Sequence, residues 1–130
     1  MIQQYSVSLL EGFNNAKFGM KRSAVRAVLG EPVREFKKSK FSKTTIDDYS
    51  FFHVFYDKDD NFEAVEFFSE VEIKVNNDVI FPASIEKLTT TEYDFNVDGD
   101  GLISTKYSIG VYAPNGVAES ILFGVKGYYL

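Results

Sequence analysis

The chain has 130 residues, of which 45% are hydrophobic and 25% charged, a composition typical of one globular domain and not of a disordered chain. Its net charge of −5 conceals two opposed blocks: residues 17–43 hold nine basic and two acidic side chains, and residues 44–72 hold nine acidic and one basic. Cysteine is absent, which excludes disulfide bonds and thiolate metal sites, and no apolar run approaches the roughly 20 residues of a membrane span. The chain opens without the basic and apolar regions of a secretion signal, so we expect a cytoplasmic protein. The two charged blocks either pair with each other or form two faces with different partners.

In chain order, the first expected element is a short strand over residues 5–10, and the second is an amphipathic helix over residues 21–29. The apolar side chains of this helix recur at i, i+3 and i+4, and its basic side chains lie on the other side. Gly30 ends the helix, and Pro32 prevents its continuation. The apolar helix positions that we expect to be buried are Val25, Val28 and Leu29.

The rest of the chain alternates mainly between strand and turn. Its high content of phenylalanine and tyrosine, 13 and 8 residues, favours strands. Strands separated by polar turns are expected over residues 33–38, 49–56, 62–68, 71–75, 107–113 and 117–123. Residues 82–88 predict a second short helix, with Ser84 as its N-cap and with Ile85 and Leu88 facing the core. Together these elements predict an α+β fold, in which helices pack on one face of an antiparallel sheet.

Two segments have similar patterns, which indicates a weak tandem repeat within a single domain of residues 1–130. Residues 18–68 and residues 82–123 each contain a helix followed by a hairpin. In both segments a Tyr-Ser pair opens the first strand of the expected hairpin, at residues 49–50 and at residues 107–108.

Residues 18–32 read Phe-Gly-Met-Lys-Arg-Ser-Ala-Val-Arg-Ala-Val-Leu-Gly-Glu-Pro, so that Gly-Met, a helix carrying valine and Leu-Gly-x-Pro follow one another at fixed spacing. This segment resembles the opening helix of the β-lactamase-inhibitor-protein-like and BamE-like (SmpA/OmlA) families. The resemblance implies helices on one face of an antiparallel sheet, and protein binding rather than catalysis. The sequence has neither the lipidated cysteine of the outer-membrane members nor the disulfides of the secreted inhibitors, so the resemblance implies a cytoplasmic variant.

Residues 96–104 match the first nine positions of an EF-hand calcium loop, with Gly101 at position six. Position one is Asn96 rather than aspartate, and position twelve is Tyr107, where the loop requires a bidentate glutamate. The flanking segments also predict strands rather than the helices of an EF-hand. We favour the alternative, a tight Asp-Gly turn, and therefore expect no metal site and no cofactor.

The candidates for catalysis are few. His53 is the only histidine, and no sequence signature supplies the nucleophile and the orienting partner that a catalytic base needs. Glu63 and Glu66 would fall on opposite faces of a regular strand, which opposes paired-carboxylate chemistry. We therefore expect no enzyme activity, and we interpret His53 as a packed or surface residue.

Residues 37–43 combine four lysines with Phe41, a weak nucleic-acid-binding pattern. A single basic cluster in an acidic protein more often forms a solvated loop, and the sequence has no Gly-rich phosphate-binding loop. Nucleic acid is therefore not the expected partner.

Both faces of the expected strand 49–56 carry aromatic side chains, although a half-exposed antiparallel strand normally alternates apolar with polar residues. Helices that cover one face would leave the other as an exposed aromatic patch surrounded by carboxylates, a pattern typical of a protein-binding site. The alternative is that both faces are buried, the second under loops or a second copy of the chain. The first interpretation predicts the partner-binding residues Asp47, Asp48, Tyr49, Phe51, His53, Phe55, Asp57, Asp59, Asp60 and Glu63.

An acidic and aromatic patch suits a basic protein partner. Together with the family resemblance and the lack of catalytic motifs, it predicts a non-catalytic, protein-binding inhibitor: a bacterial immunity protein that neutralises a cognate toxin. The alternative is a housekeeping protein-interaction module of the BamE-like type without a toxin partner. The sequence leaves the oligomeric state open.

Overall fold

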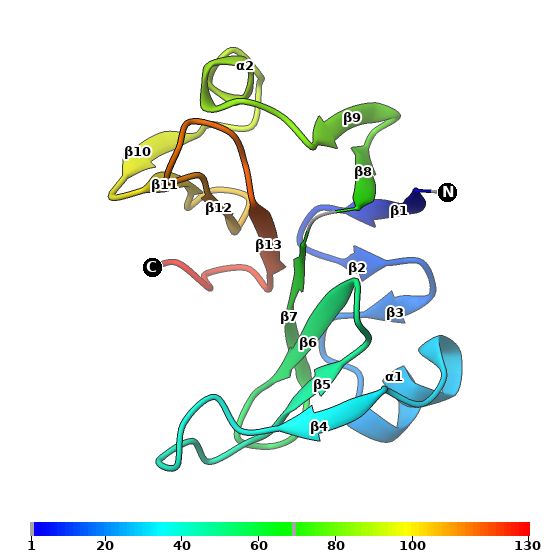
Figure 1. Cartoon of the computed structure of the whole chain (residues 1–130). Coiled ribbons are helices and arrows are strands. Elements are labelled where there is room, and N and C mark those ends of the chain that lie inside the picture. The colour runs from blue at the N-terminus through cyan, green and yellow to red at the C-terminus, as the bar shows by residue number, and fades with distance from the viewer. Residues whose placement is uncertain (1, 69) are drawn as a thin grey trace.

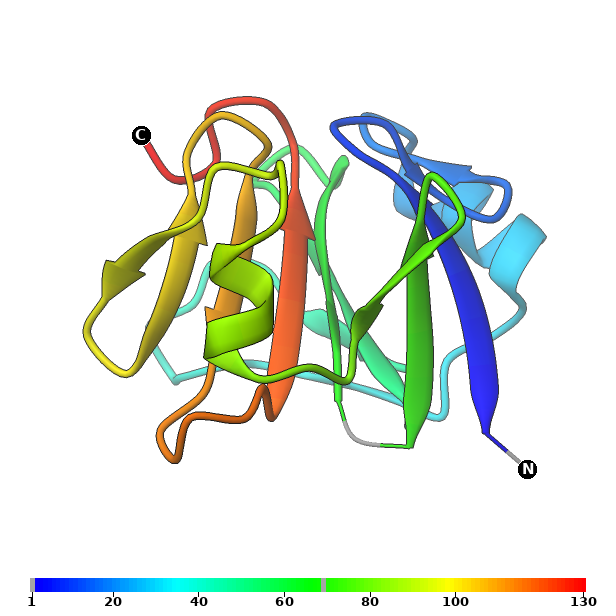
Figure 2. The same cartoon turned by 90° about the horizontal axis from the view of Figure 1, so that it is seen from above.

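The computed structural model of the chain describes residues 2–68 and 70–130, and strands account for 44% of the chain and helices for 10%. The described strands form two sheets that face each other (Figures 1 and 2). The smaller sheet has the strand order β3-β2-β1-β8-β9. Its strands are β1 (Gln3–Ser8), β2 (Gly12–Phe13), β3 (Ala16–Lys17), β8 (Val71–Val75) and β9 (Asp78–Phe81).

The larger sheet contains eight of the described strands, in the order β10-β11-β12-β13-β7-β6-β5-β4, and every neighbouring pair is antiparallel. Its strands are β4 (Arg34–Phe36), β5 (Ile46–Asp48), β6 (Phe52–Tyr56), β7 (Phe62–Phe67), β10 (Asn96–Asp98), β11 (Gly101–Ser104), β12 (Ile109–Tyr112) and β13 (Ser120–Gly124). The prediction of an antiparallel sheet is therefore confirmed for the larger sheet. The smaller sheet is mixed, because β1 and β8 pair in parallel.

Each helix connects an edge strand of the smaller sheet to an edge strand of the larger one. Helix α1 (Arg22–Leu29) links β3 to β4, and α2 (Ile85–Thr89) links β9 to β10. The two helices consequently lie at opposite ends of the pair of sheets (Figure 1). Within the part of the chain that the structure describes, neither helix is long and apolar enough to cross a membrane.

The predicted α+β fold with helices packed on one face of a sheet is wrong, because the molecule is mostly β. What covers the inner face of the larger sheet is the smaller sheet, and α1 and α2, with eight and five residues, are too short to cover it. Val25 and Leu88 are buried as expected, but Val28 is 45% exposed. A helix at the end of two sheets buries a narrower stripe of its side chains than a helix that lies on a sheet face, and Val28 falls outside that stripe.

The core lies between the sheets and is rich in aromatic rings. Phe13 of the smaller sheet packs edge-on against Phe52 and Phe67 of the larger one, with ring centroids 5.2 and 5.3 Å apart. Tyr5 of β1 contacts the same two rings at 5.3 and 5.2 Å. Such pairs contribute about 0.5–1.5 kcal/mol each beyond the burial of apolar area. The high phenylalanine content thus serves to join two sheets.

Several local predictions are confirmed. Helix α1 begins at Arg22 and ends before Gly30, whose φ of 87° suits glycine. Ser84 caps α2 by accepting a hydrogen bond from the Lys87 amide at 3.1 Å. The expected hairpins form as β6–β7 and β12–β13.

The order of elements is similar in the two halves of the chain. Each helix is followed by a meander of four strands, β4–β7 and β10–β13, and the two meanders meet where β7 pairs with β13. Ser50 and Ser108, the serines of the two Tyr-Ser pairs, both have positive φ, 74° and 54°, just before β6 and β12. A tandem repeat stays a prediction.

Candidate functional site

The larger sheet has one face turned away from the smaller sheet, which we call the outer face. In β6, Phe52, Val54 and Tyr56 are buried, whereas His53 and Phe55 are half-buried and belong to the outer face. The antiparallel register continues this face across six strands, because residues directly opposite one another share a face. One such row consists of Asp48, His53, Glu66, Leu122, Gly110 and Ile103.

An aromatic group occupies one half of the outer face. The His53 ring lies between Phe36 of β4 and Phe68, with ring centroids 5.2 and 4.6 Å apart and edge-to-face geometry. Phe55 lies on the same side of β6, and all four rings are half-buried. Half-buried rings held by their neighbours can add contact area with little further loss of side-chain entropy, which suits a binding surface.

Charged groups lie beside this aromatic group. The carboxylate of Asp48 accepts a hydrogen bond from the Arg34 guanidinium at 3.0 Å and lies 3.5 Å from Nε2 of His53. Burial alone would raise the pKa of Asp48, but the Ser50 amide and Arg34 donate to its carboxylate and hold this pKa below its ordinary value. For Glu63, burial and then the nearby Asp57 carboxylate raise the pKa.

Two tyrosines near the end of the chain lie over glycines of the outer face. The Tyr129 hydroxyl lies where a Cβ on Gly110 would be, and the Tyr128 ring would be 2.7 Å from a Cβ on Gly124. Any larger residue at either position would displace a tyrosine. Burial, followed by the neighbouring Tyr128, raises the pKa of Tyr129, so its hydroxyl is a neutral hydrogen-bonding group at physiological pH.

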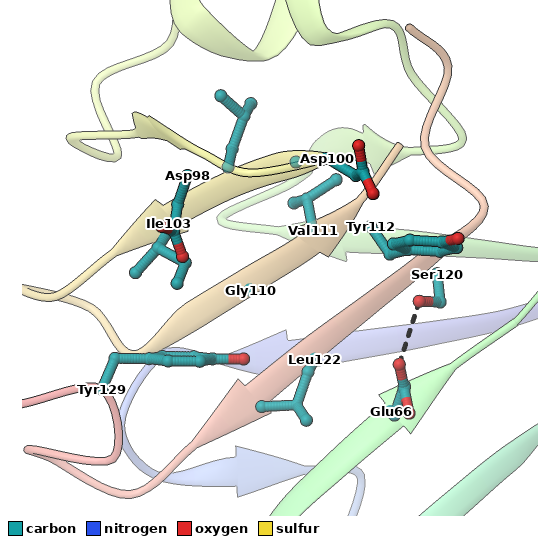
Figure 3. A pocket seen from close by; sticks show the side chains of 12 residues that line it. Glu66, Asp98, Asp100, Ile103, Gly110, Val111, Tyr112, Ser120, Leu122 and Tyr129 are labelled. Atoms are coloured by element: carbon teal, nitrogen blue, oxygen red, sulfur yellow. Dashed lines mark hydrogen bonds between the residues drawn. The ribbon is translucent and has the colours of Figure 1, made fainter. Parts of the chain in front are cut away.

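A shallow cavity of about 200 Å³ lies in the other half of the outer face (Figure 3). Glu66 stands at one side of it and accepts a hydrogen bond from the Ser120 hydroxyl at 2.9 Å, drawn as the dashed line. The cavity lining combines carboxylates with apolar side chains, as a protein-contact surface would. Its other lining side chains include Asp98, Asp100, Ile103, Tyr112, Leu122 and Tyr129.

This arrangement does not supply the parts of a hydrolytic site. The hydroxyl of Ser120 donates to Glu66, whereas the ring of His53 faces Asp48. Among the described residues, no serine or threonine hydroxyl is hydrogen-bonded to His53, although nucleophilic catalysis needs such a pair. Likewise, no three histidine or acidic side chains of the described chain converge as a metal site would require.

The prediction that Asp47 belongs to an exposed acidic rim is wrong. Its carboxylate is fully buried and accepts hydrogen bonds from Arg22 at 3.0 Å, from Nε of Arg26 at 2.9 Å and from the Tyr56 hydroxyl at 3.0 Å. Asp47 lies opposite Val54 in the ladder and so faces the core, whereas Asp48 lies opposite His53 and faces outward. The opposed charge blocks thus pair with each other here.

The prediction that Tyr49 and Phe51 share an exposed face with Phe55 also needs correction. Both side chains pack against the core, and the Tyr49 ring stacks on Phe52 at 5.0 Å with an angle of 14°. The Tyr49 hydroxyl donates to the carbonyl oxygen of Gly30 at 2.7 Å. The cause is Ser50, whose left-handed backbone breaks the alternation before β6 begins.

The turn aspartates lie beside α1. The carboxylate of Asp57 accepts hydrogen bonds from the amides of Asp59 and Asn61, both at 2.9 Å, and so stabilises its own turn. Asp60 pairs with Arg22 at 2.8 Å, whereas Asp59 is exposed. Of these three, Asp59 is the residue whose carboxylate is most open to a partner.

Glu63 and Glu66 do not fall on opposite faces as regular alternation predicted. Phe55 pairs with Ala64 but Tyr56 pairs with Phe62, so Glu63 is an extra residue, a β-bulge in β7. Glu63 lines a cavity together with Phe55 and Tyr128, and Glu66 lies opposite His53, so both side chains are at the outer face.

Sequence reasoning missed several residues of the outer face. The signal was present for Phe36, which lies in an expected strand between Glu35 and Lys37, whereas Phe68 follows Phe67 and has no such pattern. The contributions of β10–β13 had no such signal, because their place beside β7 depends on pairing between distant segments. The missed residues are Phe36, Glu66, Phe68, Tyr112, Ser120, Leu122, Tyr128 and Tyr129.

The segment that matches an EF-hand loop forms the hairpin β10–β11. Asp98 pairs with Gly101 across a two-residue turn, and Gly99 has a φ of 55°. The tight Asp-Gly turn is therefore confirmed as the backbone conformation of residues 98–101. Asp98 and Asp100 contribute acidic side chains to the cavity of the outer face.

The fold and the outer face together define a two-sheet, mostly β protein with one aromatic and acidic sheet face that Tyr128 and Tyr129 cover in part. In the comparisons with known proteins, no family model, no curated protein and no solved structure matches the chain. The resemblance to the β-lactamase-inhibitor-protein-like and BamE-like families therefore stays a prediction.

Proposed function

We propose that this chain is a non-catalytic, protein-binding inhibitor that binds a basic partner through the outer face of its larger sheet. The observation that carries the proposal is the aromatic group of Phe36, His53, Phe55 and Phe68, which is half-buried without being part of the core. A large sheet face with half-buried rings, covered only in part by the last residues of the chain, is typical of a protein-binding surface.

The charge of the outer face supports a basic partner. Asp48, Glu63 and Glu66 lie within the aromatic half, and Asp98 and Asp100 lie in the cavity. On the same face, Arg34 is a cation and already pairs with Asp48. Carboxylates around rings accelerate association with a positively charged protein and fix its orientation.

We further propose that the partner is a toxin and that the chain acts as its immunity protein in the bacterial cytoplasm. This step rests on the family resemblance and on the positions of Ser120 and His53. The Ser120 hydroxyl donates to Glu66 and the His53 ring faces Asp48, an arrangement that supports binding rather than catalysis. A toxin gene directly upstream in the host genome is the expected context.

The experiment is affinity capture from a lysate of the native host, using the wild-type chain and two outer-face variants, Phe55→Ala and Glu66→Lys. We expect one basic protein to be captured by the wild type and its affinity to fall by about tenfold or more in Phe55→Ala, if that ring is an anchor. Val33→Ala is the matched control, because Val33 is 71% exposed and lies outside this face.

Neutralisation distinguishes an inhibitor from a housekeeping module. The captured protein, expressed alone in a host, should arrest growth, and co-expression of the wild-type chain but not of Glu66→Lys should restore it. Equal capture by all variants, with unchanged melting temperatures, would contradict the outer face as the binding site. A captured protein without toxicity would contradict the immunity function.

A further inference from the structure

A second candidate site lies at the border of the outer face, with which it shares Phe68, and extends to Ile2 and the end of β9. It is a groove of about 520 Å³ with a predominantly apolar lining, and we call it the acidic groove. Val71, Phe81 and Ala118 form its buried base, and Ile2 at its edge is 60% exposed. Its remaining lining residues are Phe68, Glu70, Glu72, Pro82 and Glu119.

The lining of the acidic groove includes three carboxylates and, among the residues that the structure describes, no cationic side chain. Glu70 and Glu119 are exposed and Glu72 is half-buried. Among the described residues, no lysine, arginine or histidine lies within ion-pair distance of these three glutamates. An apolar floor with an unneutralised acidic rim complements an apolar side chain flanked by cations.

The chain itself contains such a segment, in the loop between β4 and β5. Phe41 is 82% exposed, and Lys37, Lys38, Lys40 and Lys43 surround it in the sequence. The loop has a defined turn at its tip, because the Ser42 amide donates to the Ser39 carbonyl at 3.1 Å and the Phe41 amide donates to the Ser39 hydroxyl at 3.2 Å. An ordered turn that presents an exposed ring is partly preorganised for binding, which lowers the entropic cost of association.

The loop and the acidic groove of one molecule lie far apart. The β4–β5 loop leaves the molecule at the lower left of Figure 1, whereas the groove lies toward the labelled N-terminus, near β8 and the end of β9. Because β4 and β5 are paired and fix both ends of the loop, it cannot reach the groove of its own chain.

We propose that the acidic groove binds residues 37–43 of a second copy of this chain, with Phe41 on the apolar base and the lysines against the three glutamates. This contact joins two different surfaces, so an open oligomer keeps a free loop at one end and a free groove at the other, whereas a closed ring keeps neither. One ring and a few ion pairs bury less surface than a stable dimer needs, so the association is weak and salt-dependent.

The test is sedimentation velocity of the full chain at rising concentration and low salt, compared with two double variants. The loop variant Lys40→Glu/Phe41→Ala has an intact groove, and the groove variant Glu70→Lys/Glu119→Lys has an intact loop. We expect the wild type to show concentration-dependent oligomers that added salt dissociates, and each variant to associate roughly tenfold more weakly. Val97→Ala is the control, because Val97 is 74% exposed in β10 and should not change the association.

Mixing the two variants gives the sharper result. The intact groove of the loop variant can accept the intact loop of the groove variant, so an equimolar mixture should form 1:1 heterodimers that do not grow further. A synthetic peptide of residues 37–43 should likewise bind the loop variant and not the groove variant.

The proposal is overturned if the wild type remains monomeric up to about millimolar concentration at low salt, or if neither double variant weakens its association. It is also overturned if the mixture forms no heterodimer while both variants keep the wild-type melting temperature. None of the four substituted residues belongs to the outer face, although the groove shares Phe68 with it. Self-association of the purified chain is therefore measured separately from partner capture by that face.

Discussion

At the level of single residues, Asp47 connects α1 to the larger sheet. Its buried carboxylate pairs with Arg22 and Arg26, whose side chains are 11% and 23% exposed. Arg26 also donates to Glu35 at 2.9 Å. A buried ion pair contributes little net stability when complete, but removing one partner leaves the other charge without compensation.

We therefore predict that Asp47→Asn lowers the free energy of unfolding by about 3 kcal/mol. This value is at the lower end of the range for broken buried ion pairs, because the Arg26 side chain retains some contact with water. Denaturant unfolding measures the change. Asp59→Asn, at an exposed site, should alter it by no more than about 0.5 kcal/mol. Equal effects of the two substitutions would show that the Asp47 network does not hold α1.

Two glutamates should respond to pH with opposite signs. The Thr45 hydroxyl and then Arg26 lower the pKa of Glu35, so its charged form stabilises the fold, and this contribution is lost as pH falls through the lowered pKa. Burial and then Asp57 raise the pKa of Glu63, so its charged form opposes folding at neutral pH, and this opposition ends as pH falls through the raised pKa.

The prediction is that Glu35→Gln destabilises the chain at pH 7 and Glu63→Gln stabilises it, each by up to about 1 kcal/mol since both side chains are partly solvated. Each difference should shrink as pH falls through the pKa of that carboxyl, first for Glu63, whose pKa is raised, and at lower pH for Glu35, whose pKa is lowered. Thermal melts of the three proteins at falling pH supply the measurement. Changes of the same sign would contradict the assigned environments.

Sequence reasoning at this scale failed at adjacent residues. Asp47 and Asp48 both looked like rim residues, although neighbours in a strand face opposite sides, so at most one could be exposed there. The inward orientation of the Asp47 side chain could not be predicted, because it depends on ion pairs with Arg22 and Arg26, more than 20 residues earlier in the chain.

At the level of elements, the residues before β6 and β12 adopt the same uncommon backbone conformation. Ser50 and Ser108 both have positive φ, a region that costs a residue with a side chain more than it costs glycine. Ser50 is exposed, whereas Ser108 is fully buried and its hydroxyl has no hydrogen-bond partner among the described residues. A buried unsatisfied hydroxyl adds a further penalty.

We predict that Ser108→Gly raises the free energy of unfolding by about 1–2 kcal/mol, since it removes both the backbone strain and the unsatisfied hydroxyl. Ser50→Gly should raise it by no more than about 1 kcal/mol, because only the strain is relieved there and glycine loses more entropy on folding. Chemical denaturation of both variants gives the comparison. A larger gain for Ser50→Gly would refute the role assigned to the Ser108 hydroxyl.

Elements that are local in sequence could be predicted, and those that depend on distant pairing could not. Helix α1, the cap of α2 and two hairpins follow from periodicity and turn residues. The parallel pair β1·β8 joins residues more than 60 positions apart, and the β-bulge at Glu63 changes the face of one side chain without a sequence signal. The layer arrangement depends on such pairs, which is why helices on a sheet face were expected in place of a second sheet.

On the scale of the whole molecule, both halves of the chain contribute to both sheets. Residues 2–68 supply β1–β3 to the smaller sheet and β4–β7 to the larger, and residues 70–130 supply β8–β9 and β10–β13. The halves join through two strand pairs, β1·β8 and β7·β13, and the core runs across the boundary, since Phe67 of β7 packs on Phe123 of β13 with ring centroids 6.1 Å apart.

Neither half should therefore fold alone, although the meanders look like separate units. A fragment of residues 1–68 would expose β7 and the inner rings of β1 and β6, and a fragment of residues 70–130 would expose β13 and lose the partner of β8. Unpaired edge strands and uncovered apolar faces do not persist as stable monomers in water. We expect each fragment to show no cooperative thermal transition, and an equimolar mixture, refolded together, to regain the near-ultraviolet tyrosine signal and the cooperative melt of the intact chain. Cooperative unfolding of either fragment by itself would contradict a shared core, and would mean that the two meanders are independent domains joined by a few strand contacts.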